Sequence, residues 1–109
     1  MNFEAFLGFT GSTATLHLAG SLDDASLPVL RSLVDQAVQQ PLRQLVLRID
    51  ELESMTPGGV RCLAFAQQHV APDVEIIVDG ANEQVREAMR LGGFDQAVTF
   101  VAERAVLAG

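Results

Sequence analysis

The helix start that decides our interpretation of this chain is the stretch Met-Thr-Pro-Gly-Gly-Val at positions 55–60. Thr56 is a favourable N-cap, because its side-chain oxygen can accept a hydrogen bond from a free backbone N–H one turn later. Pro57 suits the first helical position, where its missing N–H costs nothing. Gly58 and Gly59 are poor helix formers, so they need another reason to be there. Either they leave a flat backbone with accessible N–H groups for a partner or an anion, or they pack closely against a neighbouring element.

The composition favours one globular domain over residues 1–109, with 49% hydrophobic residues and enough length to bury a core. No apolar run approaches the roughly 20 residues that span a bilayer, so we expect no membrane insertion. The chain does not begin with a basic segment followed by an apolar run, as a signal peptide would. Cys62 is the only cysteine, which excludes an internal disulfide and fits a reducing compartment. We therefore expect a cytoplasmic protein.

The formal net charge of −7 restricts the partners that suit the chain, which has seven arginines and no lysine. Nucleic acids and anionic lipids both require a positive surface, so we expect neither as a partner. A basic protein partner fits this charge better. The alternative, that the acidity only keeps the protein soluble, stays open.

Hydrophobic periodicity predicts an initial β-hairpin followed by alternating helices and strands. The hairpin strands are expected at 3–9 and 13–19, and apolar runs mark later strands at 45–49, 74–78 and 98–101. The run at 45–49 is nearly continuous, as expected for a strand covered on both faces, and an acidic loop at 50–53 follows it. Helices are expected at 26–40, 57–70 and 83–91, with a further helical turn at 103–107. This order argues for an α/β fold with a largely parallel sheet.

Several residues have a predicted place on these elements. Asn82 should cap the third predicted helix, and the double glycine at 92–93 should end it. The apolar faces of the second and third helices should bury Phe65 and Leu91, among others. Cys62 lies on a packed helix without a neighbouring base, so we expect its thiol to be inert.

The motifs that would indicate an enzyme are missing from the sequence. Neither glycine-rich phosphate-binding pattern occurs, and the nucleophile motif Gly-x-Ser-x-Gly is absent. The acidic pair Asp23 and Asp24 imitates a response-regulator receiver, but a chain without lysine lacks that domain's late lysine. His17 and His69 have neither triad partners nor metal-ligand spacing, and His17 falls on the polar face of its strand. We expect no enzymatic activity, no metal and no cofactor.

Four short segments, in order, resemble the STAS domain family, the family of anti-sigma factor antagonists. Gly-Ser-Leu-Asp at 20–23 resembles its Gly-Glu-Leu-Asp signature, and 45–49 resembles its central buried strand. The segment 55–63 aligns with its hydrophobic-Asp-Ser-Ser-Gly-Leu-x-x-Leu motif, and 89–95 resembles its late Leu-x-x-x-Gly-Leu helix end. The resemblance covers nearly the whole chain. It implies a STAS-like fold, a mixed sheet of four to five strands with its helices mainly on one face.

The resemblance also implies that a regulatory step is lost. In the family, the second serine of Asp-Ser-Ser-Gly accepts a phosphoryl group from a partner kinase, the anti-sigma factor. Gly58 aligns with that serine and has no hydroxyl, so we expect no phosphorylation at the family position. A shifted alignment would bring Thr56 or Ser54 near the site, but it abandons the match over 59–63.

The resemblance further implies a partner-binding surface. Its residues come from the loop after the second strand and from the start of the helix at Pro57, which we expect to lie side by side: Ser21, Asp23, Asp24, Thr56, Pro57, Gly58 and Arg61. The alternative role for Asp23 is that of a plain helix-start carboxylate.

The function that the resemblance implies is that of a bacterial anti-sigma factor antagonist. Such a protein, or a related adaptor, would bind an anti-sigma factor or a similar ATP-binding protein and regulate sigma-factor-dependent transcription. One alternative is a STAS adaptor of a phospholipid-transport ABC complex, whose Thr-Gly-Gly-Leu segment is similar. Another is a small-ligand sensor with a cleft beside the helix at Pro57. Whether the protein forms a homodimer stays open.

Overall fold

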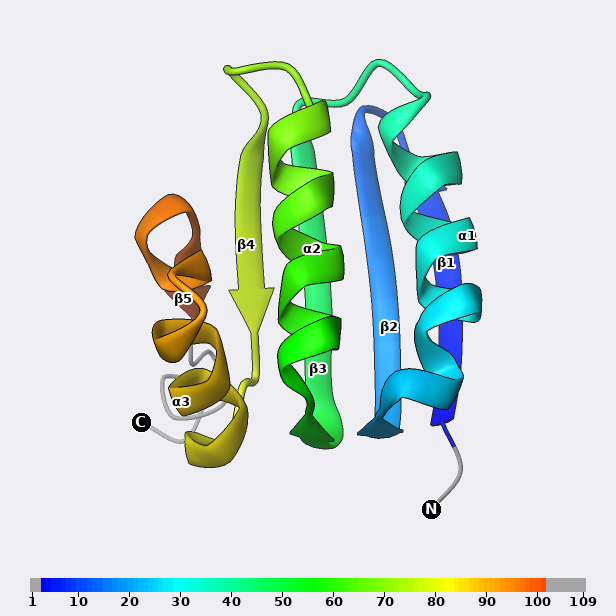
Figure 1. Cartoon of the computed structure of the whole chain (residues 1–109). Helices are drawn as coiled ribbons and strands as arrows, with labels where there is room; N and C mark the ends of the chain where they lie inside the picture. Colours follow the sequence, from blue (N-terminus) through cyan, green and yellow to red (C-terminus); the bar gives the residue numbers. More distant parts are fainter. Residues whose placement is uncertain (1–2, 102–109) are drawn as a thin grey trace, which may run out of the picture.

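The computed structural model describes residues 3–101, which form a hairpin followed by alternating helices and strands (Figure 1). The strands are β1 (Phe3–Thr10), β2 (Thr13–Leu22), β3 (Gln44–Met55), β4 (Glu75–Asp79) and β5 (Thr99–Val101). The helices are α1 (Leu27–Val38), α2 (Pro57–His69) and α3 (Glu83–Leu91), with short 3₁₀ turns η1 (Asp24–Ser26) and η2 (Phe94–Ala97). The expected helical turn at 103–107 lies outside the described residues.

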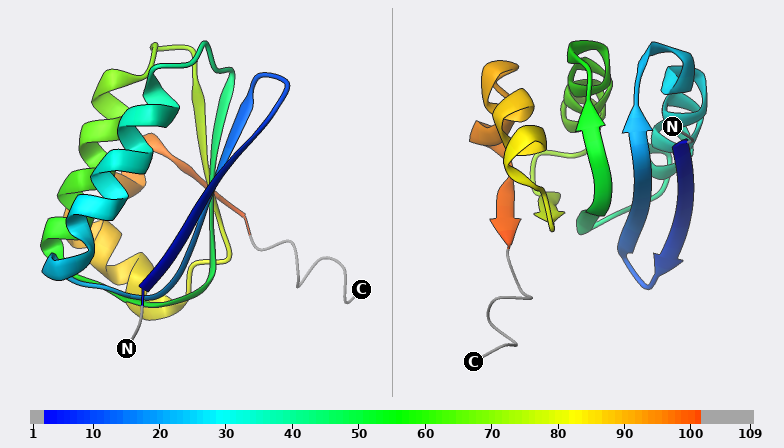
Figure 2. Two further views of the ribbon diagram at one scale, coloured as in Figure 1. Left: turned by 90° about the vertical axis from the view of Figure 1, so that its right-hand side faces the viewer. Right: turned by 90° about the horizontal axis from the view of Figure 1, so that it is seen from below.

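The five strands form one mixed sheet in the order β1-β2-β3-β4-β5. β1 runs antiparallel to β2, and the remaining neighbours are parallel. Each parallel crossover steps one strand in the same direction, and such crossovers are right-handed, so all three helices fall on one face (Figure 2, left). The predicted fold class, an α/β STAS-like sheet with helices mainly on one face, is confirmed.

The helices and the sheet bury a continuous apolar core between them. A fully buried leucine or valine stabilises the folded state by roughly 1.5–3 kcal/mol relative to an exposed one. The sheet contributes side chains on alternate positions, and the helices contribute one face each: Leu16, Leu18, Leu47, Ile49 and Val78 from the strands, with Leu30, Val34, Leu63, Val85 and Met89 from the helices. This core fixes the position of α2, whose first turn contains Gly58 and Gly59.

Strand β3 is longer and less covered than the sequence suggested. The expected acidic loop at 50–53 is wrong, because β3 continues through it to Met55 with Leu52 buried between exposed Glu51 and Glu53. The expectation that both faces of this strand are covered is also wrong. No helix of the described residues covers the second face, where Val46 and Arg48 are only half-buried.

The third helix begins where the sequence predicted. Asn82 caps α3, because its side-chain oxygen accepts a hydrogen bond from the backbone N–H of Val85 at 2.8 Å. Its amide nitrogen also donates to the carbonyl oxygens of Leu52 and Glu53, at 3.1 and 3.3 Å. The asparagine therefore joins α3 to the extended end of β3. Gly93 follows the helix with a φ of +78°, a conformation that glycine adopts at little cost.

Two side chains expected in the core lie on the surface. Phe65 in α2 is 41% exposed and stacks on His69 one turn later. Leu91 at the end of α3 is 73% exposed. Both predictions were wrong because a helix presents an apolar stripe wider than the area that the sheet covers. Phe65 thus lies on the outer surface of α2, and Leu91 lies across from α2 in a groove that the two helices share.

Candidate partner-binding site

The first turn of α2 has the geometry that the sequence predicted. Thr56 is the N-cap, with extended backbone angles, and its side-chain oxygen accepts from the N–H of Gly59 at 3.4 Å. Pro57 is the first helical residue. The two predictions about this helix start are confirmed, and they explain why the chain turns sharply from β3 into α2.

The two glycines that follow have different roles. Gly59 is buried, and a Cβ there would lie 2.7 Å from Cδ2 of Leu22, so this glycine allows close packing between α2 and the end of β2. Gly58 is half-buried, and a Cβ there would lie 3.0 Å from Oδ1 of Asp24 and 3.1 Å from Cδ1 of Leu27. Both neighbours are the ends of flexible side chains. The packing alternative therefore holds for Gly59, while Gly58 borders the surface.

The end of β2 and the start of α2 lie side by side, as expected. The backbone N–H of Thr56 donates to the carbonyl oxygen of Leu22 at 3.0 Å, and its hydroxyl donates to Oδ1 of Asp24 at 3.4 Å. Ser21 is paired with Ser54 across the β2–β3 ladder. We call this region the α2 corner, comprising Ser21, Asp23, Asp24, Thr56, Pro57, Gly58 and Arg61. It lies where the parallel strands end, at the bottom of Figure 1, which is the edge where open α/β sheets bind their ligands.

The members of the α2 corner differ in how free their side chains are. Ser21 is a half-buried residue inside β2, since this strand runs to Leu22 and does not end at Ala19 as expected. Asp23 caps η1, because its Oδ1 accepts from the N–H and the hydroxyl of Ser26 at 3.1 and 3.0 Å. Asp23 therefore has the structural role of a helix-start carboxylate, the alternative raised by the sequence. Pro57 and Arg61 are exposed.

A groove of about 280 Å³ separates α1 from α2 beside Gly58. We call it the α1–α2 groove, lined by Leu27, Arg31, Gly58, Arg61, Cys62 and Phe65. Burial raises the pKa of the Cys62 thiol, and the positive charge of Arg31 opposes that shift only in part. The thiol therefore stays protonated at neutral pH, which is consistent with an inert cysteine. Sequence reasoning missed Arg31, because no motif connects it to a helix 30 positions further on.

A second groove of about 510 Å³ lies on the other side of α2, against α3. We call it the α2–α3 groove, and its apolar lining includes Met55, Pro57, Val60 and the exposed Leu91. The two helices approach closely because Gly92 has no side chain: a Cβ there would lie 2.5 Å from Cγ1 of Val60. The α2 corner is thus flanked by one groove with two arginines and one that is largely apolar.

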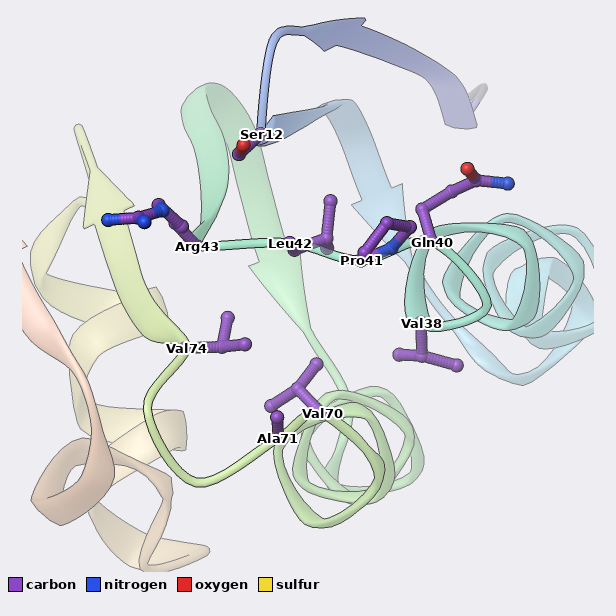
Figure 3. Close-up of a pocket in the computed structure, with 9 residues that line it drawn as sticks. All are labelled: Ser12, Val38, Gln40, Pro41, Leu42, Arg43, Val70, Ala71 and Val74. Carbon is purple, nitrogen blue, oxygen red and sulfur yellow. The ribbon is translucent and has the colours of Figure 1, made fainter.

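The other end of the sheet holds a pocket of about 530 Å³ between the loops that precede β3 and β4 (Figure 3). Valine side chains from α1 and from the α2–β4 connection line it, and the guanidinium of Arg43 points away from the other lining residues. Within residues 3–101, no cluster of three histidine, cysteine or acidic side chains is arranged to hold a metal. Nor is any helix in that range long and apolar enough to cross a membrane.

The sequence matches the family model described as "Mlab, STAS domain" over residues 5–103, and the chain therefore belongs to this STAS family. No curated protein sequence matches it significantly. The resemblance inferred from four short motifs is confirmed. The class that family and fold together define is that of a STAS domain.

Solved structures of anti-sigma factor antagonists share the fold. One from Mycobacterium paratuberculosis superposes with a TM-score of 0.83 at 16% identity, covering 98% of this chain and 93% of that chain. SpoIIAA in its unphosphorylated form gives 0.76 at 18% identity, covering 97% and 93% of the two chains. The phosphorylated form of SpoIIAA, a Bacillus cell fate determinant, gives 0.70 at 17% identity, covering 98% and 97%. At these identities the likeness establishes the fold alone.

Proposed function

We propose that this protein is an adaptor of the anti-sigma factor antagonist type. It binds an anti-sigma factor, or a related ATP-binding protein, through the α2 corner and thereby regulates sigma-factor-dependent transcription. The observation that carries the proposal is the pair of hydrogen bonds from Thr56 to Leu22 and Asp24. They join two segments more than 30 positions apart into one surface at the carboxyl ends of the parallel strands, with an open groove on each side.

Binding in this proposal does not depend on phosphorylation of the chain. Gly58 stands at the family's acceptor position and offers no hydroxyl. The hydroxyl of Thr56 is engaged in the cap of α2 and with Asp24, and Ser54 is half-buried in β3 opposite Ser21. Neither Thr56 nor Ser54, the alternative acceptors, therefore presents a free hydroxyl at the start of α2. The complex is therefore controlled by the amount or state of the partner.

A transport adaptor is the second candidate. The segment 56–60 resembles the Thr-Gly-Gly-Leu segment of STAS subunits in phospholipid-transport ABC complexes, and the matching family model is described as the Mlab STAS domain. Such an adaptor would use the same α2 corner against an ATPase subunit. The two candidates therefore differ in partner and share a surface.

The test recovers the partner from native cell extract with the full-length protein and measures its affinity by calorimetric titration. An anti-sigma factor supports the first candidate, and a transport ATPase replaces it with the second. Gly58→Gln adds bulk at the head of α2 without placing a second carboxylate beside Asp24. It should weaken binding by more than tenfold, or about 1.4 kcal/mol.

The control variant is Arg43→Gln at the opposite end of the sheet, which should bind as the parent does. Circular dichroism and urea titration establish that both variants are folded. If Gly58→Gln binds with parental affinity, the interface lies elsewhere and the proposal fails.

A further inference from the structure

The α1–α2 groove carries an unusual concentration of positive charge for so acidic a chain. The chain has a net charge of −7 and seven arginines, and two of these, Arg31 and Arg61, line a groove of about 280 Å³. One comes from α1 and the other from α2, so the groove is basic on both walls. No acidic side chain is among the residues that line it.

Neither arginine of the groove has a partner in the part of the chain that the structure describes. Neither forms an ion pair with an acid within residues 3–101, and neither makes a hydrogen bond there. Three other arginines are engaged: Arg48 lies 3.7 Å from Asp79, Arg90 is paired with Glu87, and Arg86 lies over the ring of Phe100. The groove thus keeps two positive charges available to an incoming group.

Three acidic side chains lie close to residues of the groove, and one of them, Glu87, lines the α2–α3 groove together with Arg61. Asp24 lies beside Gly58, where it accepts the hydroxyl hydrogen of Thr56. Asp35 lies one turn beyond Arg31 on α1 and accepts from the amide of Gln39 at 3.1 Å. Two guanidinium charges face the one carboxylate of Asp24, so the groove keeps a net positive potential that attracts an anionic group. A protein partner carries its negative charge mainly as aspartate and glutamate carboxylates.

We propose that the α1–α2 groove receives an aspartate or glutamate side chain of the protein partner, held between Arg31 and Arg61. A guanidinium binds a carboxylate through two parallel hydrogen bonds, so a side chain flanked by two such groups gains both affinity and a fixed orientation. The exposed ring of Phe65 and the side chain of Leu27 contact the aliphatic part of the incoming residue. The protonated thiol of Cys62 adds no charge to compete. This proposal rests on the proposed function and names the chemistry that the partner brings to this side of the α2 corner.

A first test uses the full chain and a defined probe. Acetyl-tetraglutamate amide is titrated into ¹⁵N-labelled protein, and the arginine Nε–Hε signals are followed by NMR. The signals of Arg31 and Arg61 should shift saturably. The signal of Arg43, whose side chain likewise has no ion pair or hydrogen bond within residues 3–101 and lies at the far end, should not. The same titration with acetyl-tetraglutamine amide should move neither. Equal shifts at Arg43, or none at Arg31 and Arg61, would overturn the proposal.

A second test separates this proposal from the proposed function. Arg31→Gln and Arg43→Gln lower the net charge equally, so long-range attraction to the partner changes by the same amount in both. With the partner recovered above, Arg31→Gln should weaken binding at least tenfold and Arg43→Gln should not. If Gly58→Gln weakens binding while Arg31→Gln does not, the acidic contact is refuted and the α2 corner stands. If neither Gly58→Gln nor Arg31→Gln weakens binding, both proposals fail.

Discussion

Removing the hydroxyl of Thr56 tests the cap on which the geometry of the α2 corner depends. Thr56→Ala deletes the oxygen that accepts from the N–H of Gly59 at 3.4 Å and donates to Asp24 at 3.4 Å. Loss of a threonine cap typically costs about 1 kcal/mol, within a range of roughly 0.5–2. The long donor–acceptor distance places this cap in the lower half of that range. The buried position of Gly59 moves the cost upward, because water does not easily replace the lost acceptor.

These opposing corrections leave an expected loss of about 1 kcal/mol in the free energy of unfolding. For a chain of 109 residues, an unfolding entropy of about 2.1 cal/mol/K per residue converts this loss to a decrease in Tm of about 4 °C. Urea denaturation followed by circular dichroism measures the loss directly, and an unchanged m-value would show that the unfolded state is unaffected. Thr56→Ser keeps the oxygen and should stay within a few tenths of a kcal/mol of the parent.

Ser26 offers a comparison, because it occupies the N-cap position of α1 without a side-chain cap hydrogen bond, and its hydroxyl makes only an exposed bond to Asp23 at 3.0 Å. Ser26→Ala should therefore cost clearly less than Thr56→Ala. A double-mutant cycle of Thr56→Ala with Asp24→Ala should give a coupling free energy of a few tenths of a kcal/mol, because the hydrogen bond between the two side chains is long and exposed. An unchanged urea midpoint for Thr56→Ala, or an equal loss at Ser26, would refute the view that this cap holds the corner.

Three further predictions follow from the geometry and can be measured on the isolated protein or with a candidate kinase. Folding holds the Cys62 thiol protonated through its raised pKa, so the folded state binds more protons above about pH 8.5 and stability should fall as pH rises through that range. Cys62→Ala should remove this component from urea midpoints measured at pH 7.5 and 9.5, and an unaltered pH slope would contradict it. Asn82→Ala should lower the free energy of unfolding by about 2 kcal/mol, because it removes the cap of α3 and two hydrogen bonds to β3. Asn82→Asp keeps the capping oxygen and should restore only the part of this free energy that comes from the cap. If Asn82→Asp is as stable as the parent, the hydrogen bonds to β3 contribute nothing. Incubation with an anti-sigma kinase and ATP should leave the intact mass unchanged, and a stoichiometric phosphate on Thr56 or Ser54 would contradict the alignment at Gly58.

The sequence was sufficient for the features that depend on local chemistry. The starts of α2 and α3 follow from Thr56, Pro57 and Asn82, whose side chains act on the backbone within one turn. The side-by-side arrangement at the α2 corner followed from the family resemblance. The extension of β3 was missed because the period of two breaks after Ile49, and the next buried positions, Leu52 and Met55, follow at intervals of three. The ladder with β2 shifts register along the same part of the strand.

Other features depend on contacts between segments far apart in the sequence. Hydrophobic periodicity predicts single elements and carries no information about such contacts. The close contact of Gly59 with Leu22 depends on the distance between α2 and the end of β2, which only the assembled sheet fixes. The exposure of Leu91 has the same origin, because it depends on how far the sheet extends beneath α3. Arg31 looks in the sequence like an ordinary exposed residue of an amphipathic helix. It becomes a candidate binding residue only because α2 places Arg61 on the opposite wall of a groove.

The arrangement of charge around Gly58 gives the proposed interface an orientation. Asp24 lies on one side of this glycine, and the groove that contains Arg31 and Arg61 adjoins it. A partner with a basic residue facing Asp24 and an acidic residue facing the groove gains both contacts in one orientation. If the partner is rotated, its acidic residue meets Asp24 while its basic residue meets the arginines. Like-charge contacts of this kind cost several kcal/mol at an interface, so the pattern contributes more to specificity than to affinity. Gly58 suits this arrangement because it lets the partner's backbone approach between the two contacts, where a side chain would hold them apart.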